Sequence, residues 1–137
     1  MLNTKTKGDI GQLKVAGDLL MRGYTVSFPY GDNARYDLVL DRGTGLERVQ
    51  VKYVTSNGQT IIVQCKSVVS VANKLYEVRK YTESQVDWIA CYDATSNCCY
   101  YIPGTKIGEG RTQINLRLEP TNPRITYANI ASDYTEI

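Results

Sequence analysis

The chain has 137 residues, with 16 lysine and arginine residues, 14 aspartate and glutamate residues and a formal net charge of +2. A chain of this length is expected to form one domain, spanning residues 1–137, around one hydrophobic core. It contains no histidine, which excludes Ser-His-Asp and Cys-His hydrolases and zinc sites with histidine ligands.

The apolar residues and the cysteines both indicate an ordinary protein of the cell interior. No apolar run is long enough to cross a membrane and no secretion signal is present, so we expect a cytoplasmic protein with no membrane partner. The four cysteines show no C-x-x-C spacing, which favours reduced, partly buried thiols over a zinc site or disulfides. Because the net charge is modest, any affinity for nucleic acid would come from local basic patches.

The first predicted element is a helix from about Lys7 to Gly23. Its apolar residues recur at helical spacing, and Gly23 stands where a C-terminal cap is expected. The predicted buried stripe consists of Ile10, Leu13, Ala16, Gly17 and Leu20. Gln12 directly precedes Leu13, so its side chain is expected to flank the stripe.

A short strand is predicted next, over residues 24–28, and Pro29 ends it. The loop that follows, residues 30–34, has small and polar residues that let another backbone or a ligand come close. This loop could line the entrance to a site, and an ordinary connecting turn explains it equally well.

The stretch from Arg35 to Lys52 carries the strongest structural signal. Two runs of strand-forming residues flank a turn at residues 41–45, which predicts a β-hairpin. If the strands pair symmetrically about the turn, Asp37 lies opposite Gln50. Side chains alternate along a strand, so Asp37, Gln50 and Lys52 share a face that could hold a metal and a phosphate. The opposite, apolar face consists of Leu38, Leu40, Val49 and Val51.

The rest of the chain predicts further strands. Residues 60–65 indicate a third sheet strand, and residues 87–92 and 98–103 indicate a hairpin that completes the sheet. Residues 112–118 suggest a last strand or an extended arm, and residues 127–131 a short helix.

Four pieces of the first half of the chain occur in a characteristic order. They are Lys5-Thr6-Lys7-Gly8-Asp9-Ile10, Gly31-Asp32, Tyr36-Asp37-Leu38-Val39 and Val49-Gln50-Val51-Lys52. Together they resemble the PD-(D/E)XK nuclease superfamily and, within it, the group I intron-encoded homing endonucleases. The resemblance implies an α/β, restriction-endonuclease-like core, with a mixed, mostly antiparallel sheet and the N-terminal helix packed on it. It also implies a metal-dependent endonuclease that cuts double-stranded DNA at specific sites.

The resemblance gives roles to the residues of the hairpin. Asp37 would be the principal metal ligand, and the Gln50 side chain and the Val51 carbonyl would add neutral oxygens. Lys52 would orient the attacking water or stabilise charge on the phosphate. Mg²⁺ is the expected cofactor, and Mn²⁺ could substitute for it. From spacing alone, Asp37 and Lys52 could equally be a solvated cross-strand pair that contributes at most about 1 kcal/mol.

The sequence departs from the related homing endonucleases at position 12, where those proteins usually have a glutamate that reaches the metal. Here the residue is Gln12, so it could offer the metal an oxygen but no charge. With Gln50 also neutral, the site has one certain carboxylate beside Lys52, and we expect weak magnesium binding and slow or absent cleavage. Asp9, one helical turn earlier, is the only nearby carboxylate that could compensate.

Residues 66–84 look less regular and mix cations with tyrosine and asparagine, a combination suited to phosphate, sugar and base contacts. A solvated loop or helix would have a similar composition, and the resemblance favours DNA contact. The predicted DNA-binding residues are Lys5, Lys7, Asn33, Arg35, Lys66, Lys74, Arg79 and Lys80.

The size of the chain predicts more than one copy on the DNA. A compact chain of this length has a radius of gyration of about 14 Å, so one copy covers only about ten base pairs. We expect a homo-oligomer, at least a dimer, and the resemblance allows a tetramer. Three alternatives stay open: a Holliday-junction resolvase of the same fold, a catalytically inactive DNA-binding relative, and a protein-interaction domain.

Overall fold

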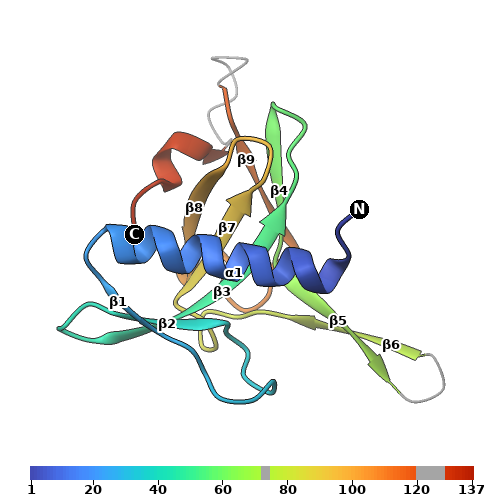
Figure 1. Ribbon diagram of the computed structural model, residues 1–137. Helices are drawn as coiled ribbons and strands as arrows, with labels where there is room; N and C mark the ends of the chain where they lie inside the picture. Colours follow the sequence, from blue (N-terminus) through green and yellow to red (C-terminus); the bar gives the residue numbers. More distant parts are fainter. Residues whose placement is uncertain (72–74, 120–128) are drawn as a thin grey trace.

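The computed structural model describes residues 1–71, 75–119 and 129–137, and one helix packed on one sheet forms its centre (Figure 1). These elements are α1 (Thr4–Met21), β1 (Thr25–Ser27), β2 (Leu38–Asp41), β3 (Leu46–Val54), β7 (Trp88–Asp93) and β8 (Cys98–Pro103). The strand order is β1-β2-β3-β7-β8, in which β3 and β7 run parallel and all other neighbours are antiparallel. The predicted mixed, mostly antiparallel sheet with an N-terminal helix is therefore confirmed.

A second, three-stranded sheet has the order β10-β9-β4. Its strands are β4 (Thr60–Gln64), β9 (Gln113–Arg117) and β10 (Asn129–Ile130). The strand predicted at residues 60–65 is present as β4, but it pairs with β9 and not with the main sheet. The helix predicted at residues 127–131 is wrong for residues 129–130, which pair in parallel with β9; residues 127 and 128 lie outside the described residues.

Two short 3-10 helices follow strands, η2 (Gly104–Lys106) after β8 and η3 (Ala131–Tyr134) after β10. A separate antiparallel hairpin, β5 (Lys66–Val71) and β6 (Leu75–Lys80), projects from the body of the molecule (Figure 1). The sequence predicted a loop or a helix here, and that prediction is wrong. Three valines among residues 66–71 favour a strand. The prediction missed the strand because it gave more weight to the charged residues around these valines.

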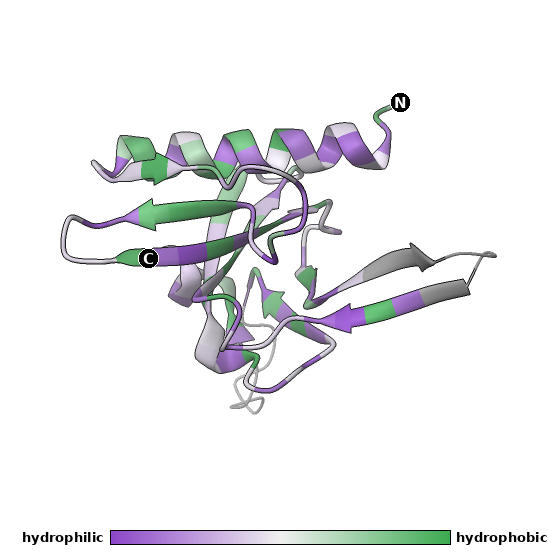
Figure 2. Cartoon of the chain, turned by 90° about the horizontal axis from the view of Figure 1, so that it is seen from below, coloured by the Kyte–Doolittle hydropathy of each residue, from purple (hydrophilic) through white to green (hydrophobic). Residues whose placement is uncertain are grey.

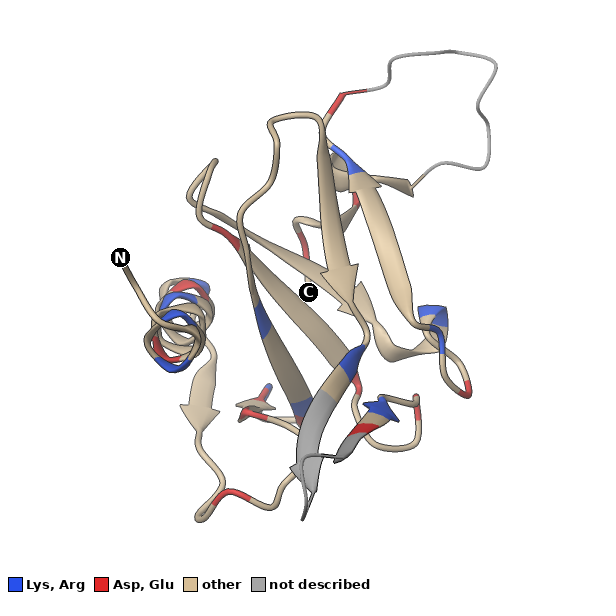
Figure 3. Cartoon of the chain, turned by 90° about the vertical axis from the view of Figure 1, so that its right-hand side faces the viewer, with Lys and Arg blue, Asp and Glu red and all other residues tan. Residues whose placement is uncertain are grey.

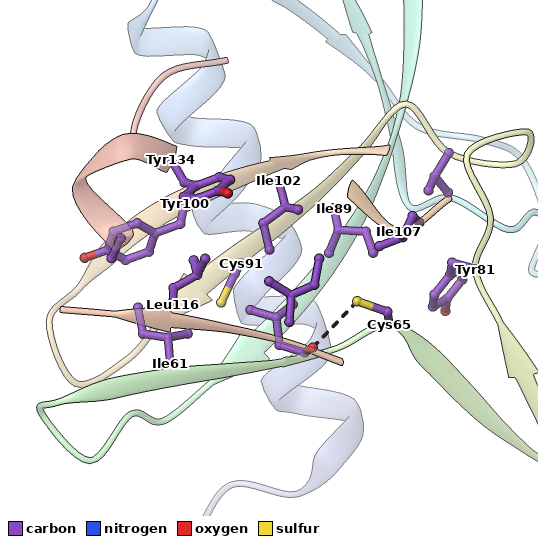
Figure 4. Close-up of a cluster of buried hydrophobic side chains, with 14 residues drawn as sticks. Ile61, Cys65, Tyr81, Ile89, Cys91, Tyr100, Ile102, Ile107, Leu116 and Tyr134 are labelled. Atoms are coloured by element: carbon purple, nitrogen blue, oxygen red, sulfur yellow. Dashed lines mark hydrogen bonds between the residues drawn. The ribbon is translucent and has the colours of Figure 1, made fainter. Parts of the chain in front are cut away.

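The main sheet is covered on both faces. On one face it packs against α1, in a cluster made of Val15, Ala16, Leu19, Leu38, Leu40, Val49, Val51, Ala90, Tyr92 and Tyr101. On the other face Ile89, Cys91 and Ile102 pack against Ile61 and Leu116 of the second sheet (Figure 4). The main sheet is thus the middle layer, and its central strand β3 is held from both sides.

The helix packs through a stripe that is shifted from the predicted one: Ala16 is buried and Ile10 is half-buried against the same cluster, as predicted, but Leu13 and Leu20 are not part of it. Its buried residues are Gly11, Val15, Ala16 and Leu19, whereas Leu13 and Leu20 are 67% and 57% exposed. Gly11 lies directly against β3: a Cβ there would lie 3.4 Å from Tyr53 Cβ and 3.4 Å from Val51 Cγ1, so no space is left for a larger side chain. Hydrophobic and hydrophilic residues alternate along α1 (Figure 2), and no helix among the described residues is long and apolar enough to cross a membrane.

Candidate active site

Asp37 stands at the end of the hairpin formed by β2 and β3. The predicted register is confirmed from Leu38, opposite Val49, to Asp41, and continuing it by one residue puts Asp37 opposite Gln50. The Asp37 N–H donates to the Val49 carbonyl over 2.9 Å, and the Val51 N–H donates to Asp37 Oδ2 over 2.8 Å. The Asp37 carboxylate therefore accepts the Val51 N–H in place of a backbone carbonyl, and this hydrogen bond fixes the carboxylate beside β3.

Burial gives this carboxyl an unusual proton affinity. Desolvation raises the pKa of Asp37 above its ordinary value, and the Val51 N–H and the charge of Lys52 oppose this rise. Desolvation also lowers the pKa of Lys52, while the charge of Asp37 opposes that change. The two groups are thus close enough to influence each other and are both partly withdrawn from water, as is common for groups in active sites.

The other two polar residues of the strand pair lie on the same side of β3. The Lys52 ammonium donates to the Lys66 carbonyl over 2.9 Å. Gln50 is only 8% exposed, and its Nε2 donates to the Val51 carbonyl over 3.3 Å. A buried amide needs such a partner, so Gln50 belongs to the interior of the site and not to a solvated strand face.

Gln12 reaches the site from the helix. Gly11 brings α1 close to β3, and the next residue places its Nε2 2.8 Å from the Asp37 carbonyl, to which it donates a hydrogen bond. Gln12 is therefore joined to the backbone of Asp37. Asp9 is exposed and lines neither of the two hollows beside Asp37.

Two hollows of about 250 and 320 Å³ lie beside Asp37. The first is lined by Gln12, Pro29, Gly31, Asp32, Ala34, Tyr36 and Asp37. The second is lined by Asp32, Asn33, Ala34, Arg35, Asp37, Gln50, Ser67, Arg79 and Tyr81. The loop at residues 30–34 thus borders both hollows. Asp32, Ser67 and Tyr81 were not singled out as site residues from the sequence. Asp32 carried a signal as part of the matched Gly31-Asp32, and Tyr81 as one of the tyrosines mixed with cations in residues 66–84.

The predicted DNA-binding residues fall into two groups. Lys66, Arg79 and Lys80 lie where the β5–β6 hairpin joins the body (Figure 3), and the Arg35 guanidinium donates to the Lys80 carbonyl over 3.1 Å. Asn33 lines the second hollow. The other group, Lys5 and Lys7, lies in the first turns of α1, and Lys74 is outside the described residues.

The oxygens of the site suit a magnesium ion that shares its ligands with a substrate. Among the described residues, no three histidine, cysteine, aspartate or glutamate side chains gather to hold a metal by themselves. Magnesium, however, is usually bound by one or two carboxylates together with water and substrate phosphate. Asp37 supplies a carboxylate beside an open hollow, and Gln12 and the Val51 carbonyl supply neutral oxygens nearby, so this donor set fits.

Comparison with known proteins agrees with this geometry. No sequence among the curated proteins matches the chain. The structure is similar to that of a bacterial homing endonuclease, I-Ssp6803I, with a TM-score of 0.72 and 25% sequence identity, over 97% of this chain and 88% of that one. A family model described as PD-(D/E)XK endonuclease matches residues 2–137, and the chain therefore belongs to the PD-(D/E)XK endonuclease family, a family of nucleases.

Proposed function

We propose that the chain is a site-specific homing endonuclease that hydrolyses phosphodiester bonds of double-stranded DNA with Mg²⁺, for which Mn²⁺ can substitute. The observation that carries the proposal is the half-buried Asp37, which shares one side of β3 with Lys52 and opens onto two hollows. The similarity to a homing endonuclease supports it. Such a protein acts inside the cell, where its DNA is.

Hydrolysis of a phosphodiester requires a positioned water, neutralisation of the phosphoryl oxygens and stabilisation of the leaving alkoxide. A magnesium ion held by Asp37, with the Gln12 and Val51 oxygens as further ligands, would supply positive charge at the phosphate. Lys52 uses one N–H for the Lys66 carbonyl, and an ammonium has three. The remaining two can orient the attacking water or donate to a phosphoryl oxygen. Gln50 holds the Val51 carbonyl in place.

DNA would lie across the β5–β6 hairpin and the start of α1. Cations at these two places can contact phosphates, which position a duplex without reading its sequence. We assign this role to Lys5, Lys7, Lys66, Lys74, Arg79 and Lys80, and place Asn33 and Arg35 beside the cut phosphate. Because one copy spans about ten base pairs, we propose that a homo-oligomer, a dimer or a tetramer, brings two active sites to opposite strands.

A second candidate is a DNA-binding relative without catalysis. The hydrogen bond from Gln12 to the Asp37 carbonyl favours it, because the neutral amide is used there to hold the backbone and adds no negative charge for a metal. In that case DNA binding would persist without cleavage.

Cleavage of plasmid and of a target library with Mg²⁺ or Mn²⁺ tests the proposal. The chain is compared with its Gln12→Glu and Lys52→Ala variants, and Lys106→Ala serves as the control because Lys106 is exposed in η2 and lines neither hollow. We expect cleavage to rise in Gln12→Glu, to vanish in Lys52→Ala and to be unchanged in Lys106→Ala. DNA binding without cleavage in every variant would favour the inactive relative, and preferred cutting of four-way junctions would favour a junction resolvase.

A further inference from the structure

Tyr81 lies where the β5–β6 hairpin meets the active-site strand. It directly follows β6, is only 4% exposed, and its N–H donates to the Cys65 carbonyl over 3.0 Å. Because Cys65 directly precedes β5, this bond closes the base of the hairpin. Tyr81 belongs to the same hydrophobic cluster as Cys65 and Ile107 (Figure 4). Its ring is thus held by both packing and backbone.

Two cations lie close to this ring. The Arg35 Cζ is 4.3 Å and the Lys52 Nζ is 4.9 Å from the ring centroid. An aromatic ring attracts a cation at this range, and more strongly where water is excluded. The positive charges of Arg35 and Lys52 repel each other. Both can stay near the ring only if hydrogen-bond acceptors also hold them there.

Oxygens at the base of the hairpin supply those partners. Arg35 donates through Nη1 to Ser67 Oγ over 3.2 Å and through Nη2 to the Lys80 carbonyl over 3.1 Å. The Lys52 ammonium donates to the carbonyl of Lys66, the first residue of β5. Both cations are therefore attached to the ring and to the hairpin at the same time.

The lysine depends on this arrangement more than the arginine does. A guanidinium has several donors in a rigid fork, whereas an ammonium is a point charge on a flexible chain of four carbons. Arg35 would keep its hydrogen bonds to the hairpin without the ring. Lys52 would keep its single bond to the Lys66 carbonyl and the attraction of Asp37, but without the ring its flexible chain could take other positions.

We infer that Tyr81 is a positioning residue, whose ring holds the Lys52 ammonium beside Asp37 and links that position to the base of the β5–β6 hairpin. The inference rests on the proposed nuclease function for its consequence in catalysis. Tyr81 and the Lys66 carbonyl both belong to the base of the hairpin, so the position of the Lys52 ammonium depends on how that base packs against β3.

Steady-state cleavage by Tyr81→Leu and Tyr81→Phe, made in the Gln12→Glu background, tests the effect on catalysis. We expect Tyr81→Leu to lower kcat about tenfold, equivalent to about 1.4 kcal/mol, with KM changed by less than about twofold. Tyr81→Phe keeps the ring and should restore kcat. Tyr134→Leu is the control, since Tyr134 is a tyrosine buried in the same cluster. An equal fall of kcat in this control would overturn the inference.

A measurement that needs no cleavage separates this inference from the proposed function. The side-chain methylene protons of Lys52 next to the ammonium should resonate upfield of free lysine in NMR spectra, because they lie near the Tyr81 ring. We expect this displacement to disappear in Tyr81→Leu and to persist in Tyr81→Phe and Tyr134→Leu. A displacement unaffected by Tyr81→Leu would refute the positioning role. If the displacement behaves as expected while no variant cuts DNA, the proposed function fails and the positioning of Lys52 stands.

Discussion

Replacing Gln12 by glutamate should make the stability of the protein depend on magnesium. In the present chain the Gln12 amide donates a hydrogen bond of 2.8 Å to the Asp37 carbonyl. A carboxylate at position 12 cannot donate this hydrogen bond. Its negative charge would instead face the partly buried carbonyl oxygen of Asp37. When a hydrogen bond is lost and its acceptor is left unpaired, the free energy of unfolding falls by about 1–3 kcal/mol. We expect a fall of this size for Gln12→Glu in the presence of a chelator.

Magnesium should reverse this loss. A ligand that binds only the folded state at about 100 times its Kd adds about 2.7 kcal/mol to the free energy of unfolding, which is similar to the cost of the lost bond. A pair of carboxylates binds magnesium better than one, so the gain should be larger in Gln12→Glu than in the starting chain. Protonation of the new carboxylate would also relieve its contact with the carbonyl, so the loss in chelator should shrink as the pH falls.

Urea unfolding in chelator and in magnesium, read by circular dichroism, gives the two free energies. Gln12→Ala is the matched control, because it loses the same hydrogen bond without gaining a ligand. It should be destabilised in chelator and should not recover with magnesium. If Gln12→Glu is as stable as the starting chain in chelator, the hydrogen bond to the Asp37 carbonyl contributes nothing. If magnesium stabilises both proteins equally, position 12 is not a metal ligand.

Two further predictions concern stability. The raised pKa of Asp37 means that the folded state binds this proton more tightly than the unfolded chain, so the contribution of Asp37 to stability is most favourable at low pH and is lost as the pH rises through the folded pKa. Asp37→Asn should therefore raise the free energy of unfolding at pH 7 more than at pH 3 in urea titrations without metal, and a larger gain at pH 3 would refute the assignment. Gly11→Leu should destabilise the protein by about 1–3 kcal/mol through overpacking against β3, as measured by thermal unfolding. Gly8→Leu in the same helix is its control, because no atom lies within 4 Å of a Cβ at Gly8, and equal effects of the two changes would show that close packing at Gly11 is not the cause.

The β2–β3 hairpin and its register could be predicted because local signals determine them. The turn residues and the alternation of apolar and polar side chains fix which strand residues face each other. Asp37, Gln50 and Lys52 could therefore be placed together from the sequence. The burial of Gln50 could not, since its neighbours in the second hollow include Ser67 and Tyr81, which are distant from it in the chain.

The helix stripe and the β5–β6 hairpin show where sequence periodicity is insufficient. The apolar Leu13 and Leu20 suggested one face of α1, but the face that packs on the sheet is the one that carries Gly11, Val15 and Leu19. For similar reasons the role of Tyr81 has no local signal. Its contacts with Arg35 and Lys52 join three segments that are far apart in the sequence.

The parallel pairing of β3 and β7 has a consequence for how such a protein can diversify. Parallel neighbours need a long crossover connection, which in most proteins contains a helix. Here the crossover contains β4 and the β5–β6 hairpin. A segment that the topology requires in any case thus carries Lys66, Arg79 and Lys80, three of the cations proposed to contact DNA. These three cations stand in the crossover and not in β3 or β7, so substitutions at their positions would alter the proposed contacts to DNA without changing a residue of the two parallel strands.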